Sequence, residues 1–86
     1  MPKAKSAEKR ARTNLKQRER NRRDRSRLRT AIKKVRQAES PDGARSALRG
    51  AESLLDRLAS KGVIHANAAA RQKSRLGAHV ARLEAA

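Results

Sequence analysis

The 86-residue sequence contains no cysteine and no aromatic residue. Without cysteine, a small scaffold held by disulfides and a cysteine-based metal site are both excluded. Without Phe, Tyr or Trp, the chain cannot stack nucleic-acid bases on aromatic rings, which is the usual way of holding single strands. Because no long apolar run is present, we find neither a transmembrane helix nor a signal peptide and expect a soluble, intracellular protein.

Large apolar residues are also scarce, with eight Leu, two Ile, three Val and one Met. At about 1.5–3 kcal/mol for each buried side chain, they offer a small core for a chain of this length. We therefore expect part of the chain to become ordered only when a partner binds.

The chain shows no group of residues suited to metal binding or catalysis. His65 and His79 lie fourteen positions apart, without cysteine or convergent carboxylates, whereas a metal site needs ligands close together on one surface. There is no glycine-rich phosphate loop and no nucleophile beside a base. We expect a protein that is not an enzyme and that holds no metal and no cofactor.

What the chain has in excess is positive charge. Lys and Arg number 24 against 8 Asp and Glu, which gives a formal net charge of +16. A compact chain with this excess repels itself, so the charge predicts a polyanionic partner, nucleic acid first and an anionic membrane surface second. The excess is uneven, since residues 1–38 hold 16 basic and 3 acidic side chains and residues 39–86 hold 8 and 5.

Proline, glycine and apolar spacing divide the chain into three predicted helices. Residues 4–39 contain neither proline nor glycine and are rich in helix-forming residues. The sequence "SPDG" that follows favours a turn, or else Ser40 or Asp42 caps a second helix. That helix has the clearest amphipathic pattern and is predicted to end at Gly62 in a left-handed cap, with a third helix from about residue 66.

These helices predict an all-α fold in a single domain, residues 1–86. Short connections favour antiparallel neighbours, so we expect an up-down-up three-helix bundle with an extended basic N-terminal helix. Leu28 begins the apolar stripe of the first helix that faces the core. Residues 1–27 are therefore predicted to form a basic helical arm, and residues 28–86 the bundle.

The arm has two interpretations. Residues 16–27, "KQRERNRRDRSR", contain no apolar residue and seven Lys or Arg, which lie on all sides of a helix. They form either a solvated, disordered tail or a helix lodged between phosphate backbones, where the planar fork of arginine suits phosphate oxygens. Glu8 with Arg12 and Glu19 with Arg23 have the i, i+4 order that favours ion pairs in a helix.

The third helix presents a second candidate surface. Arg71, Ser74 and Arg75 share a face opposite the predicted core stripe of Leu76, Val80 and Leu83. Lys73 lies near the core boundary. His65 and Asn67 stand at the helix start, where they either cap the helix or meet an anion. On composition alone, a solvated face and a binding face are equally consistent with this pattern.

Three strings carry a resemblance to a known family. "KSAEKRAR" near the start, "LRTAIKKV" at 28–35 and "KGVIHANAAARQKSRL" at 61–76 resemble the bacterial S-twenty family of small-subunit ribosomal proteins, over essentially the whole chain. The resemblance implies a three-helix bundle with an extended first helix. It also implies direct binding to 16S ribosomal RNA, at its 5′ domain and its long penultimate helix, and an early role in assembly. Gly77 departs from the family pattern and is expected to interrupt the third helix.

The resemblance further implies a cytoplasmic, ribosome-associated protein with few protein–protein contacts. The RNA-binding residues that it carries over are Lys5, Ser6, Lys9, Arg10, Arg29, Lys33, Lys34, His65, Asn67, Arg71, Lys73, Ser74 and Arg75. Charge alone adds eight further positions in the arm, namely Lys3, Arg12, Lys16, Arg18, Arg20, Arg22, Arg23 and Arg27. The alternative function is that of a histone-like DNA-compacting protein. A membrane-active helix is third, because the arm lacks an apolar face for lipid.

Overall fold

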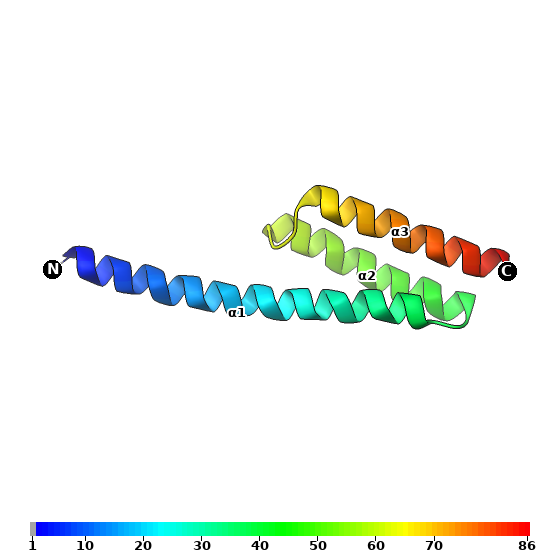
Figure 1. Ribbon diagram of the computed structural model, residues 1–86, viewed down its shortest axis with the longest axis horizontal. Helices are drawn as coiled ribbons and strands as arrows, with labels where there is room; N and C mark the ends of the chain where they lie inside the picture. Colours follow the sequence, from blue (N-terminus) through cyan, green and yellow to red (C-terminus); the bar gives the residue numbers. More distant parts are fainter. Residues whose placement is uncertain (1) are drawn as a thin grey trace.

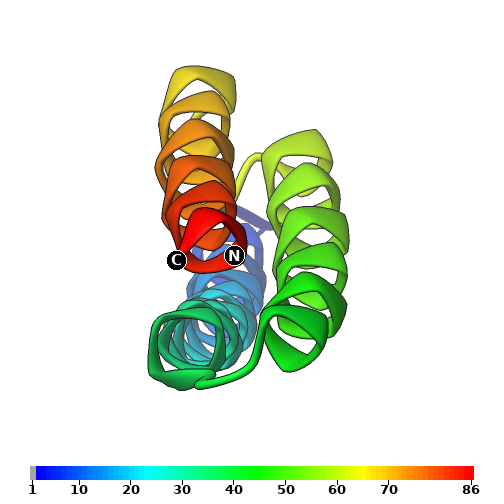
Figure 2. The ribbon, with the colours of Figure 1, turned by 90° about the vertical axis from the view of Figure 1, so that its right-hand side faces the viewer.

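The computed structural model describes the backbone of residues 2–86 and the side chains of residues 6–86. Over this range the chain forms three helices and no strand, α1 (Pro2–Gln37), α2 (Pro41–Lys61) and α3 (Ala66–Ala85) (Figure 1). The predicted all-α bundle with an extended first helix is therefore confirmed. The molecule is 67 Å long, because α2 and α3 lie beside only the C-terminal half of α1. Seen end-on, the helices form a triangle in which α2 contacts both neighbours most extensively (Figure 2).

The connection between α1 and α2 leads to the N-terminus of α2, which is capped. Ser40 is the N-cap of α2, and its hydroxyl oxygen accepts a hydrogen bond from the backbone N–H of Gly43 at 3.1 Å. Pro41 occupies the first helical position, where its missing N–H is not needed. Ser40, rather than Asp42, is thus the cap. A Cβ at position 43 would lie 2.9 Å from the Ser40 hydroxyl oxygen, so glycine permits this close approach.

The connection between α2 and α3 has the predicted left-handed cap. Gly62 has a φ of 78°, which a residue with a side chain rarely adopts. Its N–H donates to the carbonyl of Ala59 at 3.1 Å, and the N–H of Val63 donates to the carbonyl of Leu58 at 3.0 Å. This pair of hydrogen bonds is the Schellman motif. It reverses the chain and turns the buried Val63 side chain into the core.

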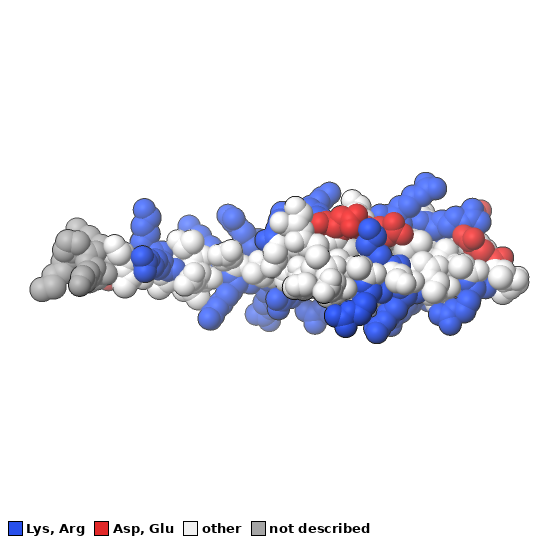
Figure 3. Space-filling view, turned by 90° about the horizontal axis from the view of Figure 1, so that it is seen from above, with Lys and Arg blue, Asp and Glu red and all other residues white. Residues whose placement is uncertain are grey.

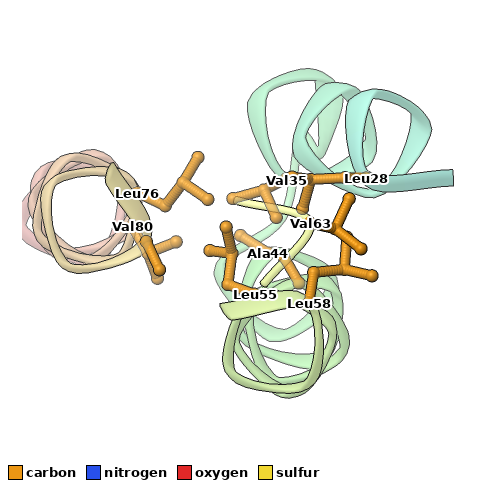
Figure 4. Close-up of a cluster of buried hydrophobic side chains, with 10 residues drawn as sticks. Leu28, Val35, Ala44, Leu55, Leu58, Val63, Leu76 and Val80 are labelled. Atoms are coloured by element: carbon orange, nitrogen blue, oxygen red, sulfur yellow. The ribbon is translucent and has the colours of Figure 1, made fainter. Parts of the chain in front are cut away.

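The hydrophobic core lies between the three helices at the bundle end of α1 (Figure 4). Its largest fully buried side chains are Leu55, Leu58, Leu76 and Val35. From residue 6 onward, α1 contributes only Leu28 and Val35 to the buried set, and all side chains of residues 6–20 are exposed. The N-terminal half of α1 therefore has no protein core against which to pack.

Gly77 does not interrupt α3, contrary to the expectation from the sequence. The helix runs without a break from Ala66 to Ala85. A Cβ at Gly77 would meet no other atom within 4 Å, so the glycine marks no close approach in this structure. Leu76 and Val80 lie on either side of Gly77 in the sequence and are buried. Their packing maintains the helix, although glycine in a helix costs about 1 kcal/mol relative to alanine.

Candidate nucleic-acid interface

The basic side chains of the arm that the structure describes are exposed and form no close ion pair. In α1, every Lys and Arg from residue 9 onward is exposed. Of the three ion pairs within 4.0 Å among residues 6–86, none involves an arm side chain. The favourable spacing of Glu8 with Arg12 and of Glu19 with Arg23 thus gives no close ion pair in this structure. The cations of the arm are free to bind an external polyanion.

The structure places most predicted site residues on the surface. Exposed side chains are those of Ser6, Lys9, Arg10, Arg12, Lys16, Arg18, Arg20, Arg22, Arg23, Arg27, Arg29, Lys33, Lys34, His65, Asn67, Arg71, Ser74 and Arg75. The predicted sites at Lys3 and Lys5 lie outside the described side chains. Lys73 is the one predicted residue among those described that is partly buried.

α3 separates Lys73 from the other cations that were predicted with it. A helix turns by about 100° per residue, so Arg71 and Arg75 share a face and Lys73 lies about 160° from both. The Lys73 ammonium donates a hydrogen bond to the Asp56 carboxylate of α2 at 3.0 Å. This partly exposed pair is worth at most about 1 kcal/mol. It directs Lys73 toward α2, and the candidate surface of α3 consists of Arg71, Ser74 and Arg75.

His65 is the N-cap of α3. Its Nδ1 atom accepts a hydrogen bond from the backbone N–H of Asn67 at 3.0 Å. In the neutral ring the proton is therefore on Nε2, which can donate outward from the exposed side chain. The structure thus selects His65, rather than Asn67, as the cap and leaves the Asn67 amide without a hydrogen bond among the described residues.

Acidic side chains gather where α2 and α3 meet. Arg45 of α2 donates to the Glu84 carboxylate of α3 at 2.6 Å, and this hydrogen bond, with the charges of Glu84 and Asp42, raises the pKa of Arg45. Together with Asp56 and Lys73, these residues form a surface of α2 and α3 on which acidic and basic side chains alternate. Figure 3 shows the acidic side chains toward one edge of the bundle, mixed with Lys and Arg, whereas Lys and Arg predominate along the arm and the opposite edge. A polyanion is favoured on α1 and the adjacent face of α3.

The structure also shows a hydrogen bond between α1 and the α2–α3 connection that the sequence did not predict. Arg25, which was not among the predicted site residues, donates from Nη2 to the carbonyl oxygen of Val63 at 3.3 Å. This hydrogen bond joins α1 to the α2–α3 connection beside a cavity of about 340 Å³. No sequence signal pairs two residues 38 positions apart.

Other classes of site find no counterpart in the described part of the chain. No group of three or more His, Cys, Asp or Glu side chains there could hold a metal ion. No helix within that range has the length and apolar character needed to cross a membrane.

The arm has helical backbone from Pro2 onward, yet we expect residues 4–25 to be largely unfolded in the free protein. Long helices draw most of their stability from packing, and this stretch has no core contact. Repulsion among the cations opposes the helix until phosphates neutralise them. Amide hydrogen exchange on the free protein and on its RNA complex measures this. Strong protection across residues 16–25 without RNA would show that the arm is preformed.

Comparison with known proteins shows similarity to one family of ribosomal proteins. Residues 2–81 match the family described as ribosomal protein S20. The small ribosomal subunit protein bS20 of Nitrosomonas eutropha is 53% identical over 77 residues, covering 86% of this chain and 88% of the relative. The bS20 protein of Xanthomonas oryzae pv. oryzae is 46% identical over 89 residues and covers 100% of both chains. That of Symbiobacterium thermophilum is 49% identical over 86 residues, 100% of this chain and 92% of the relative.

Proposed function

Because the chain belongs to the family of ribosomal protein S20, a structural constituent of the small ribosomal subunit in the bacterial cytoplasm, we propose that it binds 16S ribosomal RNA directly. Its role in translation is structural and not enzymatic. By this proposal it stabilises the folded arrangement of the RNA during assembly, and its contacts are to RNA rather than to other proteins.

The observation that carries this proposal is the arm of α1. It is a helix with exposed cations on all sides and no close ion pair among the described side chains, and residues 6–20 are all exposed. A helix of this kind is stabilised when phosphates surround it, because they replace repulsion between neighbouring cations by attraction. The arm therefore suits a place between RNA backbones better than it suits solvent.

The bundle supplies the second element of the mechanism. Its core fixes α3 beside the C-terminal half of α1, so that Arg71 and Arg75 are presented at a fixed position relative to that half. Once the arm is helical on the RNA, its basic surface and that of α3 can hold two RNA segments in a defined arrangement. Phosphate contacts fix position and carry little sequence information, so selectivity comes from the shape of A-form helices and junctions.

Replacing Arg71 and Arg75 together by Glu tests the α3 surface. We expect RNA binding to weaken and helical content to stay unchanged, because both side chains are exposed and lie away from the core. Binding is measured by filter retention on folded 16S ribosomal RNA, and folding by circular dichroism.

The matched control replaces Arg49 and Arg57, two exposed arginines of α2, by Glu. It changes the net charge by the same amount at two positions for which we propose no RNA contact. Equal weakening by both variants would show that total charge, and not the α3 face, determines binding. A collapse of the circular dichroism signal in the first variant would show that these arginines support the bundle.

A further inference from the structure

A notch lies where the arm leaves the bundle. It is a cavity of about 340 Å³ between one face of α1 and the α2–α3 connection, lined among others by Gln17, Asn21, Asp24 and Val63. The hydrogen bond from Arg25 to the Val63 carbonyl lies beside it and fixes the connection against α1. The volume is at the lower end of the range for small-molecule sites, about 300–1,000 Å³. The notch is therefore large enough for one flat ring system but not for a double helix.

The chemistry of the notch differs from that of the surrounding arm. Asn21 and Asp24 are the only residues of 6–27 that are partly buried, and the others are exposed. With Gln17, they place two amides and one carboxylate on the same face of a helix whose other polar side chains are mostly cations. Among the described residues, neither Asp24 nor either amide has a hydrogen bond or ion pair within the chain.

The Asp24 carboxylate decides which part of an RNA fits the notch. An ionised carboxylate only accepts hydrogen bonds and repels phosphate. Adenine, cytosine and guanine carry exocyclic amino groups that donate to such an acceptor, whereas uracil has no amino group and offers only its ring N3–H. Lys16, Arg20 and Lys61 also line the notch and supply the cations that flanking phosphates require.

We propose that the notch binds one unstacked nucleotide of the RNA, whose base donates its amino group to Asp24 and contacts the Asn21 amide. This proposal rests on the proposed function and adds a base-reading site to an interface that otherwise contacts phosphates. Single-stranded bulges and loops are the usual targets of sequence-specific RNA recognition, because their bases can be splayed out and read at their edges. The notch thus discriminates against uridine and against fully paired RNA.

The sign of one substitution tests the proposal. Asp24→Asn removes a negative charge from a basic arm, so electrostatics alone predicts tighter RNA binding. The proposal predicts the opposite, an RNA affinity that is about tenfold lower. This loss lies within the range of about 5- to 150-fold that one good base contact gives. Glu19→Gln is the matched control, because Glu19 is exposed on the same helix and does not line the notch. It should leave binding unchanged or slightly tighter. Asn21→Ala is expected to weaken binding in the same way as Asp24→Asn.

The probes are folded 16S ribosomal RNA and five synthetic RNA duplexes, four with a single unpaired A, C, G or U and one fully paired. The wild-type chain should prefer unpaired A, C or G over U and over the paired duplex, and Asp24→Asn should remove that preference. Equal binding of all five duplexes by the wild-type chain would overturn the proposal, as would Asp24→Asn behaving like Glu19→Gln. If the pair Arg71→Glu and Arg75→Glu still weakens 16S binding, that failure concerns the notch alone and the proposed function stands.

Discussion

Binding to 16S ribosomal RNA is expected to weaken by about 10³–10⁵-fold when the salt concentration rises from about 50 to about 200 mM. The arm carries an excess of exposed cations without close ion pairs among the described side chains. Each phosphate that these cations contact releases condensed counterions from the RNA, and about 6–10 such contacts give the stated loss. The measurement is a series of dissociation constants across this range, plotted as log affinity against log salt concentration.

A variant of the arm provides the control for this slope. Replacing Arg18, Arg22 and Arg27 by Gln retains exposed, helix-forming polar side chains and removes three positive charges. The slope should become shallower by about 0.7–0.9 for each lost phosphate contact. A nearly flat plot for the wild-type chain, or an unchanged slope for the variant, would contradict the electrostatic account of the arm.

Leu55→Ala is expected to lower the free energy of unfolding by about 2–5 kcal/mol and to unfold much of the free protein. The Leu55 side chain has 0% exposure and lies where the three helices meet. Natural domains of ordinary size have only about 5–15 kcal/mol of stability, and this chain has few large apolar side chains to provide it. Thermal and urea unfolding of the free protein, followed by circular dichroism, measure the effect.

Leu15→Ala is the matched control for this deletion. Leu15 is 59% exposed on the arm and is not part of the core, so we expect a change within about 0.5 kcal/mol. Identical unfolding curves for Leu55→Ala and the wild-type chain would show that Leu55 does not stabilise the bundle. A large loss for Leu15→Ala would show that the arm is packed in the free protein.

The sequence predicted the helices because their ends depend on local chemistry. Pro41 and Gly43 lie in the first turn of the capped helix α2, and Gly62 adopts the left-handed conformation that its place after an amphipathic run predicts. The core residues also followed from spacing, since Leu55 and Leu76 lie on the apolar stripes of their helices. Gly77 was the exception, because its neighbours on the buried face maintain the helix through it.

Contacts between helices could not be predicted in this way. Lys73 was expected at the core boundary, but its pairing with Asp56 depends on how α2 and α3 are aligned. The notch brings Asn21 and Asp24 of α1 together with Lys61 and Val63, which lie about 40 positions further along the chain. The charged surface of the interface was therefore predictable from composition and periodicity, whereas its concave site required the relative placement of the helices.

The measurement that tests the central claim most directly compares two polyanions. Binding of the wild-type chain to labelled, folded 16S ribosomal RNA and to labelled duplex DNA is measured at the same moderate salt concentration. Each measurement is repeated with an excess of the other nucleic acid, unlabelled, as competitor. We predict that the RNA is bound at least about 10³-fold more tightly, the lower end of the range that separates specific from non-specific binding. Equal affinities for the two would contradict direct, shape-selective binding to 16S ribosomal RNA and would favour a histone-like DNA-compacting protein.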